Sequence, residues 1–434
     1  MAKIAHPITE FADIIKLNGI ECSENLSPSN RVVKRFIRIA KKVPDKRMQG
    51  VIEYPMKEIL LVAFFAVLSG AETWTQIAQF GRARESWLGK FLKYRRGTPS
   101  HDTFRRVFSL IDPSVLQTLT VDFLMDNMSR IKASLGIRDE VINVDGKQAR
   151  GTGRRKGKDG ARPNLQTLNV FDASNGICLS MECIPDRTNE IPAAQTALAL
   201  LNVKGAVVTC DTLNTQKETM RVVSTGKGNY MAALKKNHHL FYDEVDAYFT
   251  KERMKSIRKG SADFVTSIDK AHSQVERRNF YLARDVKWFA DRRAWEKLKA
   301  FVCFDKSITD TQSGEVTKER RLFISSVADA GLCAEAIRGH WAVENILYWH
   351  LDALFGDDED MTTDKNAYMN FSQFRRMALT LCKLAQPFMK CSIKSMRWLI
   401  GLEYRQELGR ILGTLDETFL EEALRAANEK KQKQ

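Results

Sequence analysis

The order of strand-like and helix-like segments predicts a mixed α/β protein with helical regions before and after the sheet. Residues 46–135 have helical patterning, and residues 139–234 alternate short apolar runs with helices. Four further strand-like runs lie between 262 and 327, and the chain is helical again from about 328. We therefore expect an α/β core with a β-rich insertion, preceded by an α-helical N-terminal domain and followed by C-terminal helices.

Composition limits the class of protein. The chain has 434 residues, of which 44% are hydrophobic, so it has ample material for a core. It carries 68 Lys and Arg against 53 Asp and Glu, and the net charge of +15 favours a polyanionic partner such as nucleic acid. The alternative is a protein that is merely basic.

Cysteine spacing and apolar runs argue against several other classes. The eight cysteines include no C-x-x-C pair, so a zinc ribbon or a thioredoxin-type site has no support. The longest apolar run, 59–68, is too short to cross a bilayer, and the N-terminus lacks the residue order of a signal peptide. We expect a cytoplasmic protein with no membrane contact.

The N-terminal part contains several short helices. Residues 1–45 are weakly patterned and form an extension, and 46–135 form a helical domain that we expect to bind DNA. An apolar helix over about 56–68 should end at Gly70, since glycine commonly follows a helix C-terminus. Further helices are expected over about 72–80 and around Trp87.

One helix of this domain carries paired arginines. It begins after Ser100, a favourable N-cap, and stops before Pro113. Its apolar side chains share one side, whereas Arg105 and Arg106 lie elsewhere. We predict that both arginines contact DNA in a helix-turn-helix-like arrangement. An ordinary helical bundle remains the alternative.

The remaining chain divides into a core, an insertion and a tail. We assign the core to 136–260 plus 328–390, the β-rich insertion to 261–327 and a C-terminal helical tail to 391–434. One helix is expected over about 332–351. Core strands are predicted over 141–144, 165–171, 177–184, 206–210 and 230–234.

Three carboxylates stand out by position. Asp145 and Asp211 each end a predicted buried strand, where α/β sheets bind ligands. Glu344 falls on the stripe of the 332–351 helix that should face the core, although burying an unpaired carboxylate is costly. Acids brought together repel one another unless cations neutralise them, and oxygen-only ligands suit Mg²⁺ or Mn²⁺.

Such a cluster suits phosphoryl transfer. Two ions about 3.5–4 Å apart activate an attacking oxygen and stabilise the leaving oxygen on phosphorus. In this interpretation Asp145 bridges both ions, while Asp211 and Glu344 each hold one. The alternative is a set of salt-bridged acids near the surface.

A basic segment follows Asp145. Its cations would hold a DNA backbone beside the acids, although a solvated loop is the alternative. Lys158 precedes Asp159 rather than completing a P-loop, so no ATP dependence is expected. The cations of this segment are Lys147, Arg150, Arg154, Arg155, Lys156, Lys158 and Arg162.

Several motifs occur in a specific order along residues 40–390. They are 43–47, 99–108, Val144-Asp145-Gly146-Lys147, Thr188-Asn189-Glu190-Ile191, Cys210-Asp211-Thr212-Leu213-Asn214 and Arg338-Gly339-His340-Trp341-Ala342-Val343-Glu344-Asn345. Together they resemble the motifs of DDE transposases of bacterial insertion sequences, in the branch containing the H-repeat-associated proteins. There are departures from related transposases, which often carry an arginine and a lysine where His340 and Leu351 fall, and Asn214 stands where a histidine is expected.

The resemblance implies an RNase H-like catalytic core in which Asp145, Asp211 and Glu344 are both the catalytic acids and the ligands of two Mg²⁺ or Mn²⁺ ions. The implied partners are double-stranded DNA, as terminal inverted repeats and as target, and a second copy of the chain in a homodimer on DNA. Such a bacterial protein would be associated with the nucleoid. The alternative is a catalytically inactive or domesticated transposase that acts as a DNA-binding protein.

The resemblance also implies DNA contacts outside the basic segment. It assigns phosphate-binding or end-binding roles to Arg338 and His340, beside the last acid, and to Arg277 and Arg278 in the insertion. Lys147 and Arg150 of the basic segment would share this role.

Overall fold

The computed structural model describes residues 26–135, 141–157, 160–174, 176–185, 188–271, 273–340, 343–389, 391–413 and Arg425. The strands are β1 (Val141–Ala149), β2 (Arg154–Gly157), β3 (Gly160–Arg162), β4 (Leu165–Asp172), β5 (Ile177–Ile184), β6 (Val207–Cys210), β7 (Asn229–Leu234), β8 (Phe264–Ala271), β9 (Gln274–Ala283), β10 (Ala300–Asp310) and β11 (Val316–Ser325). The helices before the insertion are α2 (Arg31–Ala40), α3 (Met56–Leu68), α4 (Trp74–Ala83), α5 (Glu85–Leu88), α6 (His101–Leu110), α7 (Pro113–Leu135), α8 (Glu190–Leu200), α9 (Lys217–Thr225), α10 (His239–Tyr248) and α11 (Lys251–Gly260). Those after it are α12 (Ala330–His340), α13 (Trp349–Phe355), α14 (Lys365–Met389), α15 (Ile393–Leu402) and α16 (Tyr404–Gly413).

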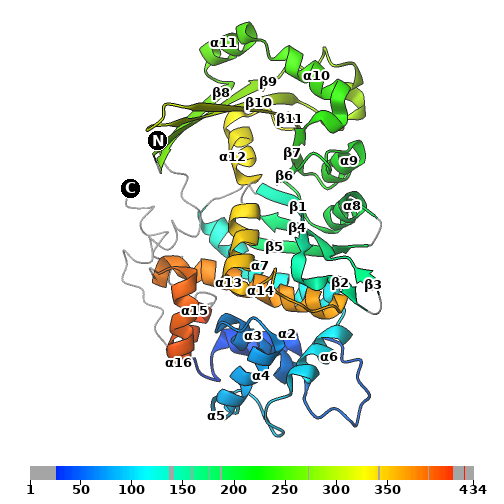
Figure 1. The fold of residues 1–434 in the computed structure, drawn as a ribbon, viewed down its shortest axis with the longest axis vertical. Coiled ribbons are helices and arrows are strands. Elements are labelled where there is room, and N and C mark those ends of the chain that lie inside the picture. The colour runs from blue at the N-terminus through cyan, green and yellow to red at the C-terminus, as the bar shows by residue number, and fades with distance from the viewer. Residues whose placement is uncertain are drawn as a thin grey trace.

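The predicted mixed α/β class is confirmed by one large sheet with helices around it (Figure 1). The strand order is β5-β4-β1-β6-β7-β11-β10-β9-β8. Strand β1 is parallel to β6, and β6 is parallel to β7, whereas the other neighbouring pairs are antiparallel. Because β11 pairs with β7, the strands between 261 and 327 extend the core sheet and do not form a sheet of their own.

Apolar side chains fill both faces of this sheet. Side chains of successive strand residues point to opposite faces. Ile142 and Val144 of β1 therefore join the larger apolar cluster, which includes α8, α9 and α10, while Val141 joins a second cluster under α12. The centre of the sheet is thus covered on both sides, and its functional groups must lie at the strand ends.

Strand β1 is longer than predicted. The sequence suggested that it ends at Asp145, but it continues to Ala149. The reason is that β1 has two neighbours. Its parallel pairing with β6 stops at Val144, opposite Cys210, while its antiparallel pairing with β4 continues to Ala149, opposite Leu165.

The N-terminal helices form one bundle with the helices at the other end of the chain (Figure 1). Helix α14 contacts α3, α6 and α7, and α16 contacts α2. The apolar side of α6 faces α14, where the rings of Phe108 and Phe374 lie 5.3 Å apart. No single described helix is long and apolar enough to cross a membrane. The bent pair of α6 with residues Pro113–Leu124 of α7, at 95°, passes by length and composition.

The described residues of the helix expected over 332–351 are helical, but they do not form one regular α-helix. Helix α12 ends at His340, Val343–Tyr348 is π-helical, and α13 begins at Trp349; Trp341 lies outside the described residues. A π-helical turn departs from the 3.6-residue spacing on which the stripe was based. Glu344 in this turn is exposed and does not face the core as the stripe predicted, whereas Leu351 is buried as predicted.

Candidate active site

Asp145 and Asp211 lie side by side on neighbouring strands. Val144 of β1 and Cys210 of β6 form the last matched pair of the parallel ladder. The two aspartates are the next residue of each chain segment, so both follow the same edge of the ladder. The strand register therefore places these two acids next to each other.

A fourth acid, Glu190, joins them from the first turn of α8. The Nδ2 atom of Asn214 donates a hydrogen bond of 2.7 Å to Glu190 Oε1 and one of 3.1 Å to Asp211 Oδ1. A Cβ atom on Gly146 would lie 2.1 Å from Glu190 Oε2, so only glycine allows this close approach. The motif Thr188-Asn189-Glu190-Ile191 contains Glu190, but no role was predicted for it; an acid at the start of a helix was the available signal.

The pKa of Asp145 reports the crowding of negative charge. Burial, followed by the charges of Asp211, Glu190 and Glu344, raises the pKa of Asp145 to about 7. Burial and the charge of Asp211 also raise the pKa of Glu190. The ionised cluster is thus disfavoured without a cation to neutralise it.

Tyr348 connects the π-helical segment that carries Glu344 to strand β1. Its hydroxyl group donates a 3.0 Å hydrogen bond to the backbone carbonyl of Asp145 and accepts one of 3.2 Å from Asn169 Nδ2. Arg376 donates in turn to Asn169 Oδ1 at 2.9 Å. These hydrogen bonds fix the position of the Glu344 segment along the strand that carries Asp145.

The donors fit a divalent cation by chemical type but are not preassembled around one. All four acids offer carboxylate oxygens, which magnesium and manganese prefer. Asn214 is fully buried, and its Oδ1 atom has no hydrogen-bond partner within the described part of the chain. Within that same part, no three His, Cys, Asp or Glu side chains stand close enough to hold one ion together. Metal binding would therefore require the carboxylates to draw together.

His340 lies at the end of α12, beside Asp211. Its Nδ1 atom is 2.9 Å from Thr209 Oγ1, and Thr209 donates a 2.9 Å bond to Asn143 Oδ1. Burial lowers the pKa of His340 to about 4, although the charge of Asp211 opposes this shift. At neutral pH the predicted DNA contact of His340 would thus be made by an uncharged ring.

Lys147 occupies a different environment from the one predicted. Its side chain is buried, and its Nζ atom contacts carboxylates of Asp352, Asp357 and Asp358. Burial alone would lower the pKa of Lys147, but Asp357 and Asp352 outweigh it and raise that pKa. Arg150, by contrast, is exposed, and its guanidinium group lies 3.6 Å from the Asp358 carboxylate.

Two other predicted DNA contacts meet at one groove. A groove of about 420 Å³ runs between β9, β10, β11 and α12 and reaches Asn345, the residue after Glu344. Four cations and one acid line it, together with Phe304: Arg278, Lys306, Arg321, Arg338 and Glu276. Arg338 is exposed, whereas Arg278 is paired with Glu276 at 2.7 Å.

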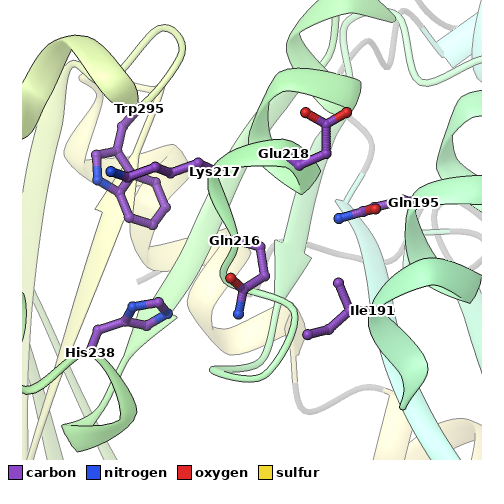
Figure 2. Close-up of a pocket in the computed structure, with 7 residues that line it drawn as sticks. All are labelled: Ile191, Gln195, Gln216, Lys217, Glu218, His238 and Trp295. Carbon is purple, nitrogen blue, oxygen red and sulfur yellow. The ribbon is translucent and has the colours of Figure 1, made fainter. Parts of the chain in front are cut away.

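A second hollow of about 320 Å³ is lined by residues of α8, α9 and the insertion (Figure 2). Trp295 and His238 stand on one side of it, and Gln195 stands on the opposite side with Ile191, which directly follows Glu190. Lys217 is held by Asp291 at 2.6 Å. This hollow is of mixed polarity, and none of the four acids lines it.

The other predicted DNA contacts are not brought to the acids. Arg105 and Arg106 are exposed on α6, in the helical bundle below the sheet (Figure 1). Arg277 is exposed, and it precedes Arg278 on β9, so the two side chains point to opposite faces. The basic segment after Arg150 forms the hairpin β2–β3. Lys158 and the side chains of Arg154, Arg155, Lys156 and Arg162 lie outside what the structure describes.

Comparison with known families identifies the class of protein. The family described as "Transposase DDE domain" matches residues 137–381, and the one described as "DDE_Tnp_1-associated" matches residues 37–124. Because the first match covers more than half of the chain, the protein belongs to the DDE transposase family. The predicted resemblance is confirmed.

Individual relatives agree with this assignment. The "H repeat-associated putative transposase YhhI" of Escherichia coli (strain K12) is 28% identical over 80% of this chain and 90% of its own length. The "Putative transposase YncI" of E. coli O157:H7 is 30% identical over 79% of this chain and 85% of its own length. A solved structure, a piggyBac transposase synaptic complex with hairpin DNA, aligns with 99% of this chain and with 85% of the piggyBac chain, at 10% sequence identity. Its TM-score of 0.33 is too low to equate the two folds.

Proposed function

We propose that this protein is a DNA transposase that binds the terminal inverted repeats of its element and catalyses metal-dependent cleavage and strand transfer. The observation that carries this proposal is the meeting of Asp145, Asp211 and Glu190 beside Glu344, with the pKa of Asp145 raised to about 7 by burial and by its acidic neighbours. A cluster of this kind is typical of sites that hold cations for phosphoryl transfer. We assign the strands β5-β4-β1-β6-β7 to an RNase H-like core.

Each residue of the site has a proposed role in holding the cations or in orienting their ligands. Asp145, Asp211 and Glu344 would hold two Mg²⁺ or Mn²⁺ ions, and Glu190 would add a fourth carboxylate. When bound, such ions activate the attacking oxygen and stabilise the leaving oxygen. Asn214 holds Glu190 and Asp211 in place, and Tyr348 holds the Glu344 segment against β1. The protein thus supplies the orientation on which an in-line displacement depends.

The groove of Arg278, Lys306, Arg321 and Arg338 supports a path for DNA beside Glu344. Phosphate contacts position the duplex without reading its sequence. The exposed arginines of α6 and the basic hairpin would add further backbone contacts. We propose that two copies of the chain act together, each on one end of the element.

Arg338→Gln is expected to weaken DNA binding by removing a phosphate contact from the groove. The slope of log K against log salt should fall in magnitude by about 0.9, because one fewer counterion is released. Fluorescence anisotropy over a salt series measures this slope. Arg221→Gln, on α9 and paired with Glu218 at 2.5 Å, is the matched control. Equal salt slopes for the two variants would show that DNA does not run through this groove.

Glu190→Gln is expected to weaken divalent-cation binding. The Mn²⁺ concentration for half-maximal thermal stabilisation should rise about 10- to 100-fold, since one negative oxygen donor is lost. Differential scanning fluorimetry over a Mn²⁺ series measures the midpoint. Glu218→Gln, a nearby exposed glutamate paired with Arg221, should leave it unchanged. An unaltered midpoint in the Glu190 variant would show that this carboxylate does not contribute to cation binding.

The direct test is a cleavage and strand-transfer assay on labelled DNA that carries the flanking inverted repeat. Mg²⁺- or Mn²⁺-dependent nicking at the repeat boundary, lost in Asp145→Ala, Asp211→Ala and Glu344→Ala, is the expected result. Tight, salt-sensitive binding without cleavage under either metal would instead identify a DNA-binding relic of a transposase.

A further inference from the structure

Lys147 lies two residues after Asp145 on strand β1, so both side chains emerge on the same side of the strand. Its Nζ atom is 3.0 Å from Asp357 Oδ2 and 3.2 Å from Asp358 Oδ1, and it also donates to Asp352. The side chain of Lys147 is only 7% exposed. Every proton of this ammonium group therefore has a carboxylate partner.

The three aspartates belong to the part of the chain that carries Glu344. Asp352 lies on α13, which follows the π-helical segment directly, and Asp357 and Asp358 follow the end of α13. Tyr348 of the same segment already holds the carbonyl of Asp145. Strand β1 and the Glu344 segment are consequently joined at two points, one at Asp145 and one at Lys147.

The contact between Lys147 and the aspartates is connected to the rest of the protein through Asp357. Asp357 is fully buried and accepts from Ser372 at 2.9 Å and from Arg375 at 3.2 Å. Arg375 also donates to Asp360 at 2.8 Å and to the backbone carbonyl of Glu72, just before α4, at 2.9 Å. The network thus runs from the strand of Asp145 to the N-terminal helices.

We infer that Lys147 is a positioning residue that sets the segment of Glu344 against the strand of Asp145, and that it does not bind DNA phosphate. A phosphate contact would require its ammonium group to leave three carboxylates, which would then repel one another without the cation that lies between them. Displacement of Glu344 relative to Asp145 would slow the reaction without changing how the protein holds DNA. This inference rests on the proposed function for its kinetic consequence, whereas the DNA-binding test below requires only that the protein binds DNA.

The test compares Lys147→Met with the wild-type full-length protein in two measurements. The first is DNA affinity over a salt series, and the second is the single-turnover cleavage rate at saturating DNA. A positioning role predicts an unchanged salt slope and a cleavage rate lower by about 10- to 100-fold. A phosphate contact predicts a slope smaller by about 0.9 and weaker binding. Lys147→Arg, which can keep the ion pairs, should restore the rate, and Gln148→Ala, the exposed next residue, should leave both measurements unchanged.

A second variant keeps the inference testable if Lys147→Met does not fold. Asp352→Asn removes one of the three carboxylates while Asp357 and Asp358 remain. A positioning role predicts slower cleavage with the same salt slope. A phosphate-binding lysine would gain freedom from this change, so tighter DNA binding with a steeper slope would overturn the inference. Absence of cleavage by the wild-type protein would count against the proposed function, whereas the salt slopes would still decide the role of Lys147.

Discussion

Asp145→Asn is expected to abolish metal-dependent cleavage and, in metal-free buffer at pH 8, to make the protein more stable than the wild type. The first effect follows because the variant loses the carboxylate whose acidic neighbours are Asp211, Glu190 and Glu344. The second follows because burial and three neighbouring acids raise the pKa of Asp145 from 3.8 to about 7. Residues that serve function at a cost in stability are common at active sites.

The sign of the pH dependence follows from proton linkage. Between about pH 4 and pH 7 the folded protein holds a proton on Asp145 that the unfolded chain has lost, so stability falls as pH rises through this window. Above pH 7 the whole cost is present, and at about 1.4 kcal/mol per pKa unit it amounts to at most about 4 kcal/mol. Asparagine does not ionise, so the variant escapes this cost.

Chemical denaturation at pH 4.5 and pH 8, with and without Mg²⁺, measures both predictions. The gain in stability of the variant should be full at pH 8 and much smaller at pH 4.5, where most of the cost has not yet developed. Mg²⁺ should stabilise the wild type and leave Asp145→Asn nearly unaffected. A gain that is the same at both pH values would show that ionisation of Asp145 is not its cause.

Much of the sheet could be predicted from the sequence because its strands are short apolar runs bounded by turns. The runs before Asp145 and Asp211 are buried on both faces, and such strands have a continuous apolar signature. The register that brings the two acids together follows from the parallel pairing of these runs. What the pattern did not show was that β1 continues beyond Asp145, since that depends on its second neighbour, β4.

The helical part of the site was less predictable. Glu344 lies in a π-helical turn, and a pattern of 3.6-residue spacing assumes that the helix is regular. Glu190 comes to Asp211 through the packing of α8 and the absence of a side chain at Gly146, which are contacts between distant segments. A count of charges also did not distinguish Lys147 from the other cations of the basic segment, because its three aspartates lie some 205 to 211 residues further along the chain.

Asp357→Asn is expected to be among the most destabilising single changes in the protein. Asp357 is fully buried between Lys147 and Arg375, and Ser372 donates to it as well. Removing one partner of a buried ion pair costs about 3–5 kcal/mol because the remaining charges stay buried without compensation. The asparagine nearly matches the aspartate in volume, so the loss reflects charge and not a cavity.

The pH dependence and a neighbouring residue distinguish this explanation from a general packing defect. Burial alone would raise the pKa of Asp357, but Arg376, Lys147 and Arg375 hold it well below its usual value. Its contribution is therefore full above about pH 4 and is lost as the pH falls below that value, so the gap between wild type and variant should narrow in acid. Urea denaturation at pH 7 and at pH 3.5 measures this gap.

Asp358→Asn is the matched control, because Asp358 is 22% exposed and only its Oδ1 atom reaches Lys147. This substitution should lower the free energy of unfolding by less than about 1 kcal/mol. Equal losses in the two variants would mean that the burial of Asp357 does not set its importance.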